Sequence, residues 1–102
     1  MQVTSQEIND TLVISLAGEL DEHSANYVRD LMDNLMSESN ARQVIVDLGQ
    51  LDFMDSTGIG VMIGRYKKMK SRGIPIFVTN PSKQIDKIFM MTALYDVMPK
   101  ID

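Results

Sequence analysis

The chain has 102 residues, a length that suits one domain with a single hydrophobic core. Its hydrophobic content of 44% and charged content of 24% are ordinary for a soluble globular protein. The net charge of −4 argues against a general nucleic-acid binder, and the absence of cysteine excludes disulfides and thiolate metal sites. There is no apolar run long enough to cross a bilayer and no signal-peptide pattern, so we expect a cytoplasmic protein without membrane contact.

The first half of the chain predicts a hairpin, a helix and a buried strand. Residues 2–8 and 11–17 have the composition of strands, and the Asn-Asp pair at 9–10 is typical of a tight turn. Apolar residues at helical spacing predict a helix over 25–40, and the apolar run 44–48 predicts a buried strand.

The second half continues the alternation of helix and strand. Helical spacing predicts a helix over 56–72, followed by a strand over 74–78 and a short helix capped by Ser82. A short final strand is expected over 97–101. Strands that alternate with helices indicate an α/β fold. We expect a mixed, mostly parallel sheet of four to five strands that opens with a hairpin, with three to four helices packed against it.

Residues 53–60 (Phe-Met-Asp-Ser-Thr-Gly-Ile-Gly) are the most informative stretch, because a strand is expected to pass into a helix there. This placement puts Ser56 and Thr57 in the first helical turn. A helix start carries unpaired N–H groups and the positive end of the macrodipole, so it favours a negative group. Ser56 is therefore a candidate phosphorylation switch. The structural alternative is that Asp55 or Ser56 only caps the helix.

The sequence contains few residues in a pattern typical of a catalytic site. Carboxylates near the expected strand ends could converge where open α/β sheets bind ligands: Glu19, Asp21, Asp52 and Asp55. However, no local pattern pairs the only histidine, His23, with a nucleophile, and Ser56 lacks the glycine framing of a hydrolase nucleophile elbow. We interpret the carboxylates as turn formers and caps, and we expect no catalysis, no metal site and no cofactor.

Other features have both a structural and a binding interpretation. Gly60 and Gly64 fall on one helical face, where they permit the close approach of a neighbouring element or of a partner. Half of the ten basic residues lie in 65–72, and a solvated helix face is the favoured interpretation. Met90 and Met91 are expected to fill the core, although an exposed soft surface is the alternative.

Three segments together resemble the anti-sigma factor antagonists of the STAS domain family: 18–21 (Gly-Glu-Leu-Asp), 53–61 and 64–67 (Gly-Arg-Tyr-Lys). The likeness is closest to the sporulation anti-anti-sigma factor and its stress-response relatives. It covers nearly the whole chain, so residues 1–102 are expected to form a single STAS domain. The Asp-Ser-Thr-Gly segment with its flanks is specific, whereas Gly-Glu-Leu-Asp alone is weak.

The resemblance implies regulation by partner switching. The unphosphorylated protein binds an anti-sigma factor that is also a serine kinase, and this binding frees the sigma factor for transcription. The kinase then phosphorylates the serine after the aspartate, here Ser56, which ends the binding, and a metal-dependent serine phosphatase restores it. The family's partner-binding surface corresponds to these positions: Glu19, Leu20, Asp21, Asp55, Ser56, Thr57, Gly58 and Gly60.

Two other functions stay open on the sequence. The first is a STAS-like interaction module in a stress-signalling or other regulatory complex. The second is a domain that binds a small ligand or nucleotide, since Gly58, Gly60 and Gly64 nearly imitate a dinucleotide fingerprint. The third glycine of that pattern is one position late, which makes the nucleotide interpretation the weaker of the two.

Overall fold

One four-stranded mixed sheet organises residues 1–101, the part of the chain described by this computed structural model. The strands lie in chain order across the sheet: β1 (Gln2–Ile8), β2 (Thr11–Leu20), β3 (Gln43–Met54) and β4 (Ile76–Thr79). β1 is antiparallel to β2, and the other neighbours are parallel. The helices are α1 (Ala25–Glu38), α2 (Ser56–Ser71), α3 (Lys83–Met91) and the short 3-10 helix η1 (Leu94–Asp96). The predicted α/β class, with its mixed sheet and opening hairpin, is confirmed.

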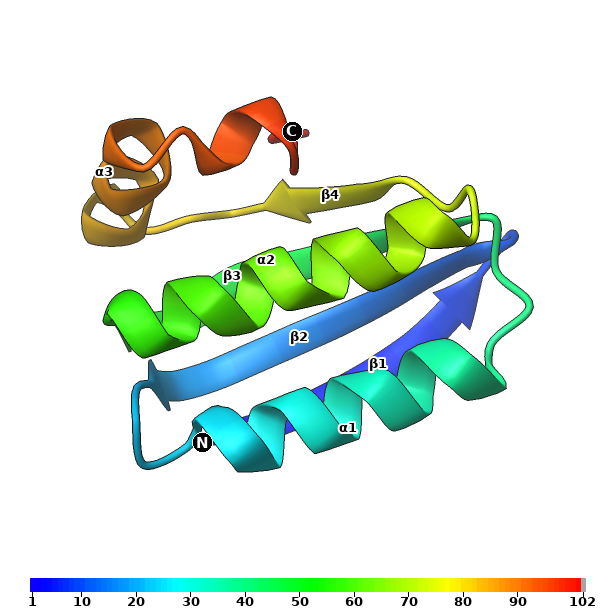
Figure 1. The fold of residues 1–102 in the computed structure, drawn as a ribbon, viewed down its shortest axis with the longest axis horizontal. Helices are drawn as coiled ribbons and strands as arrows, with labels where there is room; N and C mark the ends of the chain where they lie inside the picture. The colour runs from blue at the N-terminus through cyan, green and yellow to red at the C-terminus, as the bar shows by residue number, and fades with distance from the viewer. Residues whose placement is uncertain (102) are drawn as a thin grey trace.

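The helices cover one face of the sheet. α1 and α2 lie across that face, while α3 and η1 lie beside β4 (Figure 1). Alternate strand residues are buried and supply much of the core: Leu12, Ile14, Leu16, Val44, Val46, Leu48, Ile76 and Val78. The residues between them, such as Val13 and Ile45, stay half-buried. This period of two is expected of strands that have one covered face.

One edge of the molecule gathers the strand ends and helix starts. The carboxyl ends of β2 and β3 and the first turns of α1 and α2 lie together at the left in Figure 1. We call this edge, formed by residues 19–24 and 53–58, the loop edge. In open α/β sheets, binding sites usually form at such an edge.

The hairpin turn is confirmed at the opposite edge. Asn9 and Asp10 have φ angles of 49° and 66°, and Ile8 pairs with Thr11. Positive φ at both central residues is what a two-residue hairpin with the natural strand twist requires, and Asn and Asp tolerate it.

β2 and β3 run further toward the loop edge than the predicted strands 11–17 and 44–48. The register shifts between Ser15 and Ala17 and again between Gly18 and Glu19, and pairing then continues to Leu20 opposite Met54. Gly18 has φ of +109°. Glycine adopts this φ without a side-chain clash, so the strand continues through a bulge instead of ending. Because Leu20 and Met54 are buried, the extension carries the core out to the loop edge.

The predicted final strand over 97–101 is wrong. The segment follows η1 and forms a single bridge, between Lys100 and Val78 of β4. The N–H of Val78 donates to the carbonyl of Pro99 (3.0 Å), and the N–H of Ile101 donates to the carbonyl of Val78 (2.9 Å). Proline has no N–H to donate, which limits the ladder to this one bridge.

Side chains complete the attachment of this segment to α3. The carboxylate of Asp86 accepts hydrogen bonds from the Tyr95 hydroxyl and from Lys100 Nζ, the second at 3.1 Å. The Tyr95 ring also packs against Phe89, with 5.1 Å between centroids. The bond from Tyr95, more than that from Lys100, lowers the pKa of Asp86, while burial and the nearby carboxylate raise the pKa of Tyr95. Tyr95 therefore stays protonated and keeps its role as donor.

A buried ion pair joins α1 to α2. Arg65 is 5% exposed, and its Nε lies 3.0 Å from Asp33 Oδ1, while Lys68 Nζ lies 2.9 Å from Oδ2. Burial lowers the pKa of Arg65 and Asp33 partly offsets that effect. The interpretation of 65–72 as a solvated basic face is therefore wrong for Arg65, whose position at helical spacing from Met62 and Met69 places it on the covered side.

We expect Asp33→Asn to destabilise the fold by about 2 kcal/mol, because it removes the charge that compensates the buried guanidinium of Arg65. The matched control is Asp30→Asn, one turn earlier on the same helix, where the pair with Arg29 is solvent-exposed. That change should stay within about 0.5 kcal/mol. Urea unfolding of both variants measures the difference, and equal small effects would show that the α1–α2 ion pair does not stabilise the fold.

Candidate functional site

Asp55 caps helix α2 and leaves Ser56 without that role. The backbone of Asp55 is extended, its Oδ1 accepts from the N–H of Gly58 (2.9 Å), and its carbonyl accepts from the N–H of Ile59 (2.9 Å). Ser56 is the first residue of the helix, and both its side chain and that of Thr57 are exposed. Of the two capping candidates, Asp55 is therefore the one that caps, and the Ser56 hydroxyl is accessible at the positive end of the helix.

Hydrogen bonds join the two loops of the loop edge. The N–H of Asp55 donates to the carbonyl of Leu20 (3.3 Å), and Asp55 Oδ2 accepts from the N–H of Glu22 (3.3 Å). One carboxylate thus caps α2 with one oxygen and holds the β2–α1 turn with the other. Because of this dual role, the position of Ser56 is coupled to the position of the turn.

The β2–α1 turn is itself closed by side chains. Asp21 Oδ1 accepts from the N–H groups of His23 (2.9 Å) and Ser24 (3.1 Å). Ser24 Oγ accepts from the N–H of Asp21 (3.1 Å) and donates to the carbonyl of Glu19 (2.7 Å). The bond from Ser24, assisted by that from His23, lowers the pKa of Asp21 from its ordinary 3.8. The ionised carboxylate therefore stabilises the folded turn above pH 3.8. This stabilisation is lost as the pH falls through the lowered pKa of Asp21.

Gly58 permits the close packing of α2 on the end of β2. A Cβ atom at this position would lie 2.5 Å from the carbonyl oxygen of Leu20 and 2.8 Å from Met54 Cγ, both too close for real contacts. By contrast, a Cβ at Gly60 or Gly64 would meet no atom within 4 Å. No neighbouring element uses the space at these two glycines, so the intramolecular packing interpretation is wrong for them.

The structure divides the predicted partner-binding residues into exposed and supporting positions. Glu19, Ser56, Thr57 and Gly60 are exposed, and Asp21 and Asp55 are half-buried at the same edge. Leu20 is fully buried and Gly58 is buried, so these two positions lie beneath the surface, and their assignment to partner binding stays a prediction. Leu20 and Gly58 support the exposed residues by packing beneath them.

The remaining candidates do not form a catalytic arrangement in the described residues. His23 is exposed, and its Nε2 lies 3.7 Å from Glu22 Oε1. Asp52 is exposed on β3, and its side chain takes no part in the bonds that join the two loops. Within 1–101, no group of three or more His, Asp or Glu side chains is placed to hold a metal ion, and no helix is long and apolar enough to span a membrane.

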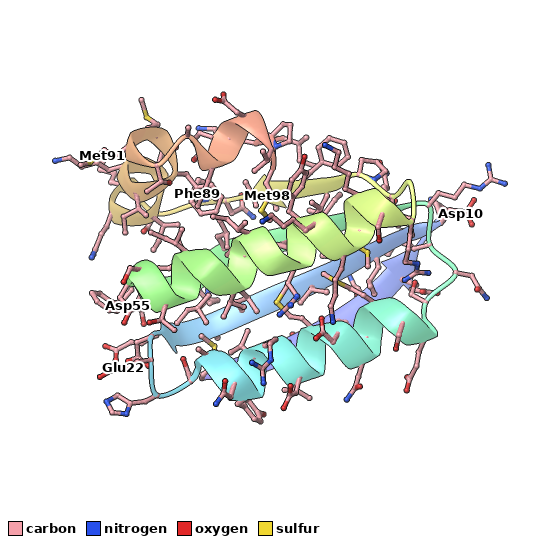
Figure 2. The ribbon with its side chains drawn as sticks, in the orientation of Figure 1. Asp10, Glu22, Asp55, Phe89, Met91 and Met98 are labelled. Atoms are coloured by element: carbon pink, nitrogen blue, oxygen red, sulfur yellow. The ribbon has the colours of Figure 1, made fainter. Side chains whose placement is uncertain are left out.

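Three large apolar side chains are exposed, of which the sequence offered exposure as the alternative for Met90 and Met91 and gave no signal for Phe53. Phe53 is 38% exposed at the end of β3, and Met90 and Met91 are 67% and 76% exposed at the end of α3. Figure 2 shows Met91 at the same end of the molecule as Asp55 and Glu22. The expectation that both methionines fill the core is wrong. Ile85 and Phe89 define the buried face of α3, and helical periodicity turns the two residues after Phe89 away from it.

With the geometry established, comparison with known proteins identifies the family. The STAS domain model matches residues 2–102. The chain belongs to the STAS domain family. Its four-stranded mixed sheet and three helices agree with solved structures of SpoIIAA, which is 26% identical in sequence. The unphosphorylated anti-sigma factor antagonist SpoIIAA matches with a TM-score of 0.81, over 99% of this chain and 89% of that one. The phosphorylated Bacillus SpoIIAA matches with a TM-score of 0.73, over 99% and 92%.

Relatives named as antagonists cover most of the chain. An anti-sigma F factor antagonist from Paenibacillus polymyxa is 31% identical over 102 residues, all of this chain and 87% of the relative. An anti-sigma-B factor antagonist from Bacillus subtilis is 31% identical over 93 residues, 91% of this chain and 83% of the relative. These two relatives, an anti-sigma F and an anti-sigma-B factor antagonist, thus match this STAS domain at equal identity.

We expect Gly58→Ala to destabilise the fold by about 2 kcal/mol, because the new methyl group must displace the end of β2 or the start of α2. Gly60→Ala is the control, since it sits two residues later in open space. It should stabilise the helix by about 1 kcal/mol, the difference in helix propensity. Thermal melts of both variants test this contrast, and similar melting temperatures would contradict the close packing at Gly58.

Proposed function

We propose that this STAS domain is an anti-sigma factor antagonist that acts by partner switching, with Ser56 as the phosphorylated residue. The single observation that carries the proposal is the exposed Ser56 hydroxyl in the first turn of α2, a position already capped by Asp55. The names of the relatives and the solved phosphorylated form of SpoIIAA support the assignment. The protein is proposed to act in the cytoplasm on an anti-sigma factor that is also a serine kinase.

The partners catalyse the proposed phosphorylation and dephosphorylation, and this chain supplies the nucleophile. In the proposed complex, the Ser56 hydroxyl oxygen attacks the γ-phosphorus of ATP bound to the kinase. The bond between that phosphorus and ADP breaks, and the hydroxyl proton passes to a base of the kinase. A metal-dependent serine phosphatase hydrolyses the phosphoserine and restores the binding form. The chain itself needs no catalytic residue or cofactor for this cycle.

A phosphate at Ser56 should change the surface more than the fold. It adds about −1.5 to −2 charges at neutral pH, next to N–H groups at the helix start that have no intrahelical acceptor. The helix accommodates this charge favourably. The surrounding surface already carries Asp21, Glu22 and Asp55. A partner that fits the unphosphorylated surface would have to cover and desolvate the phosphate on binding. The cost of desolvating this anion opposes binding.

The choice between the sporulation and stress-response branches stays a prediction. The likeness of the three segments together is closest to the sporulation antagonist but does not decide the branch, and the two relatives named above, one of each kind, are both 31% identical to the chain. An interaction module of another regulatory complex is the alternative outcome, in which no anti-sigma factor binds.

We expect Ser56→Asp to fold normally and to bind the anti-sigma kinase from the same genome much more weakly than wild type. A carboxylate at a helix start is favourable by about 0.3–1 kcal/mol, so the melting temperature should hold or rise slightly. Ser56→Ala is the control, which should bind and resist inactivation by ATP. Calorimetric titration and thermal melts measure both properties, and wild-type affinity in Ser56→Asp would contradict a binding surface centred on this residue.

We expect Asp21→Asn to weaken binding clearly and to lower the melting temperature only slightly. Asparagine keeps the oxygen that accepts from the N–H groups of His23 and Ser24, but it loses the charge available to a basic partner group. Asp52→Asn is the matched control, an exposed carboxylate on β3 outside the turn. The same titrations and melts apply. Unchanged affinity in Asp21→Asn would limit this residue to its structural role in the turn.

A further inference from the structure

The nine methionines of the chain divide sharply by exposure. Met1 is half-buried. Six others are between 0% and 3% exposed: Met32, Met36, Met54, Met62, Met69 and Met98. Met90 and Met91 are 67% and 76% exposed. Two adjacent thioethers are therefore open to solvent while nearly all the others are enclosed by the core.

The side chains of Met90 and Met91 are not part of the buried face of α3. The buried side chains of α3 are Ile85 and Phe89, and the helix ends directly after Met91. At that end the N–H and the hydroxyl of Thr92 both donate to the carbonyl of Ile88 (3.0 and 2.7 Å). The backbone bonds of the exit turn do not involve the Met90 or Met91 side chains. A change in the polarity of these side chains should leave the core intact.

The end of α3 that carries the pair lies at the same end of the molecule as the surface proposed for binding. Phe53, Met90 and Met91 are three of the five large apolar side chains that are exposed in the described residues, and Met91 lies at the same end as Asp55 in Figure 2. Phe53 precedes Ser56 by three residues, and α3 contacts β3, the strand that ends at Met54. Exposed apolar side chains next to a functional site commonly form part of an interface, and methionine adapts its shape to a partner.

We propose that Met90 and Met91 are an oxidation site, at which a peroxide converts the thioethers to sulfoxides and weakens binding of the anti-sigma partner. In each step the sulfur lone pair attacks one peroxide oxygen and the O–O bond breaks. An S–O bond forms and, for hydrogen peroxide, water leaves. The sulfur is oxidised by two electrons and the peroxide is reduced by two. A methionine sulfoxide reductase reverses the change.

The effect on binding follows from the change in polarity. A thioether is apolar and pliable, whereas a sulfoxide is polar and must be desolvated when a partner covers it. Oxidation thus opposes binding at the same surface as phosphorylation, but without adding charge. This second part of the proposal rests on the proposed function, whereas the selective reaction of the pair does not.

The first experiment measures where the chain is oxidised. Wild type is treated with graded hydrogen peroxide, and the modified residues are identified by peptide mass mapping alongside thermal melts. Met90 and Met91 should react before the six buried methionines, with an unchanged melting temperature. The control, Met90→Leu/Met91→Leu, should take up no oxygen at those six positions at the same dose. Reaction of core methionines first, or unfolding at the dose that modifies the pair, would overturn the proposal.

The second experiment measures the consequence for binding. Calorimetric titration with the anti-sigma kinase compares wild type and the double leucine variant, each before and after peroxide. Oxidation should weaken wild type about tenfold, equivalent to about 1.4 kcal/mol, and leave the leucine variant unchanged. Equal affinity of reduced and oxidised wild type would overturn the proposal. If reduced wild type does not bind at all, the proposed function fails, while the peptide map still decides the selectivity of the oxidation.

Discussion

The contact between the start of α2 and the end of β2 is the constraint on which the rest of the loop edge depends. Gly58 has no side chain, so the helix lies against the Leu20 carbonyl, where a methyl group would come within 2.5 Å. Asp55 reinforces the contact through its N–H to Leu20 and its carboxylate to Glu22. The ends of two parallel strands and the starts of two helices are thereby fixed as one unit, with Ser56 on its outer surface.

This arrangement separates the stability of the helix from the phosphorylation proposed for Ser56. Asp55 satisfies the N–H of Gly58, so the Ser56 hydroxyl need not serve as a cap. Because the Ser56 side chain does not cap the helix, adding or removing a phosphate there should disturb the fold little. The helix start also favours the added negative charge. On this account, phosphorylation regulates binding through the surface that a partner meets, and the buried ion pair and core that support α2 remain unchanged.

Periodicity predicted the elements well, while the departures each have an identifiable physical cause. The hairpin, the three helices and the alternation of strands and helices along the chain follow from spacing and turn residues. The extension of β2 through Gly18 was missed because a glycine inside a strand is read locally as a stop, whereas pairing with β3 continues past the bulge. The burial of Arg65 depends on Asp33 from another helix, which a local pattern does not contain. For the site, the role of Gly58 depends equally on a tertiary contact, that with the end of β2, whereas the assignment of Ser56 as the switch residue stays a prediction.

The most direct measurement of the central claim is the site of phosphorylation by the anti-sigma kinase from the same genome. Wild type, Ser56→Ala and Thr57→Val are incubated with the kinase and ATP, followed by intact mass and phosphopeptide mapping. The account predicts a single phosphoryl group on Ser56 in wild type and in Thr57→Val, and none on Ser56→Ala. Modification of Thr57 with Ser56 untouched, or full phosphorylation of Ser56→Ala, would contradict it.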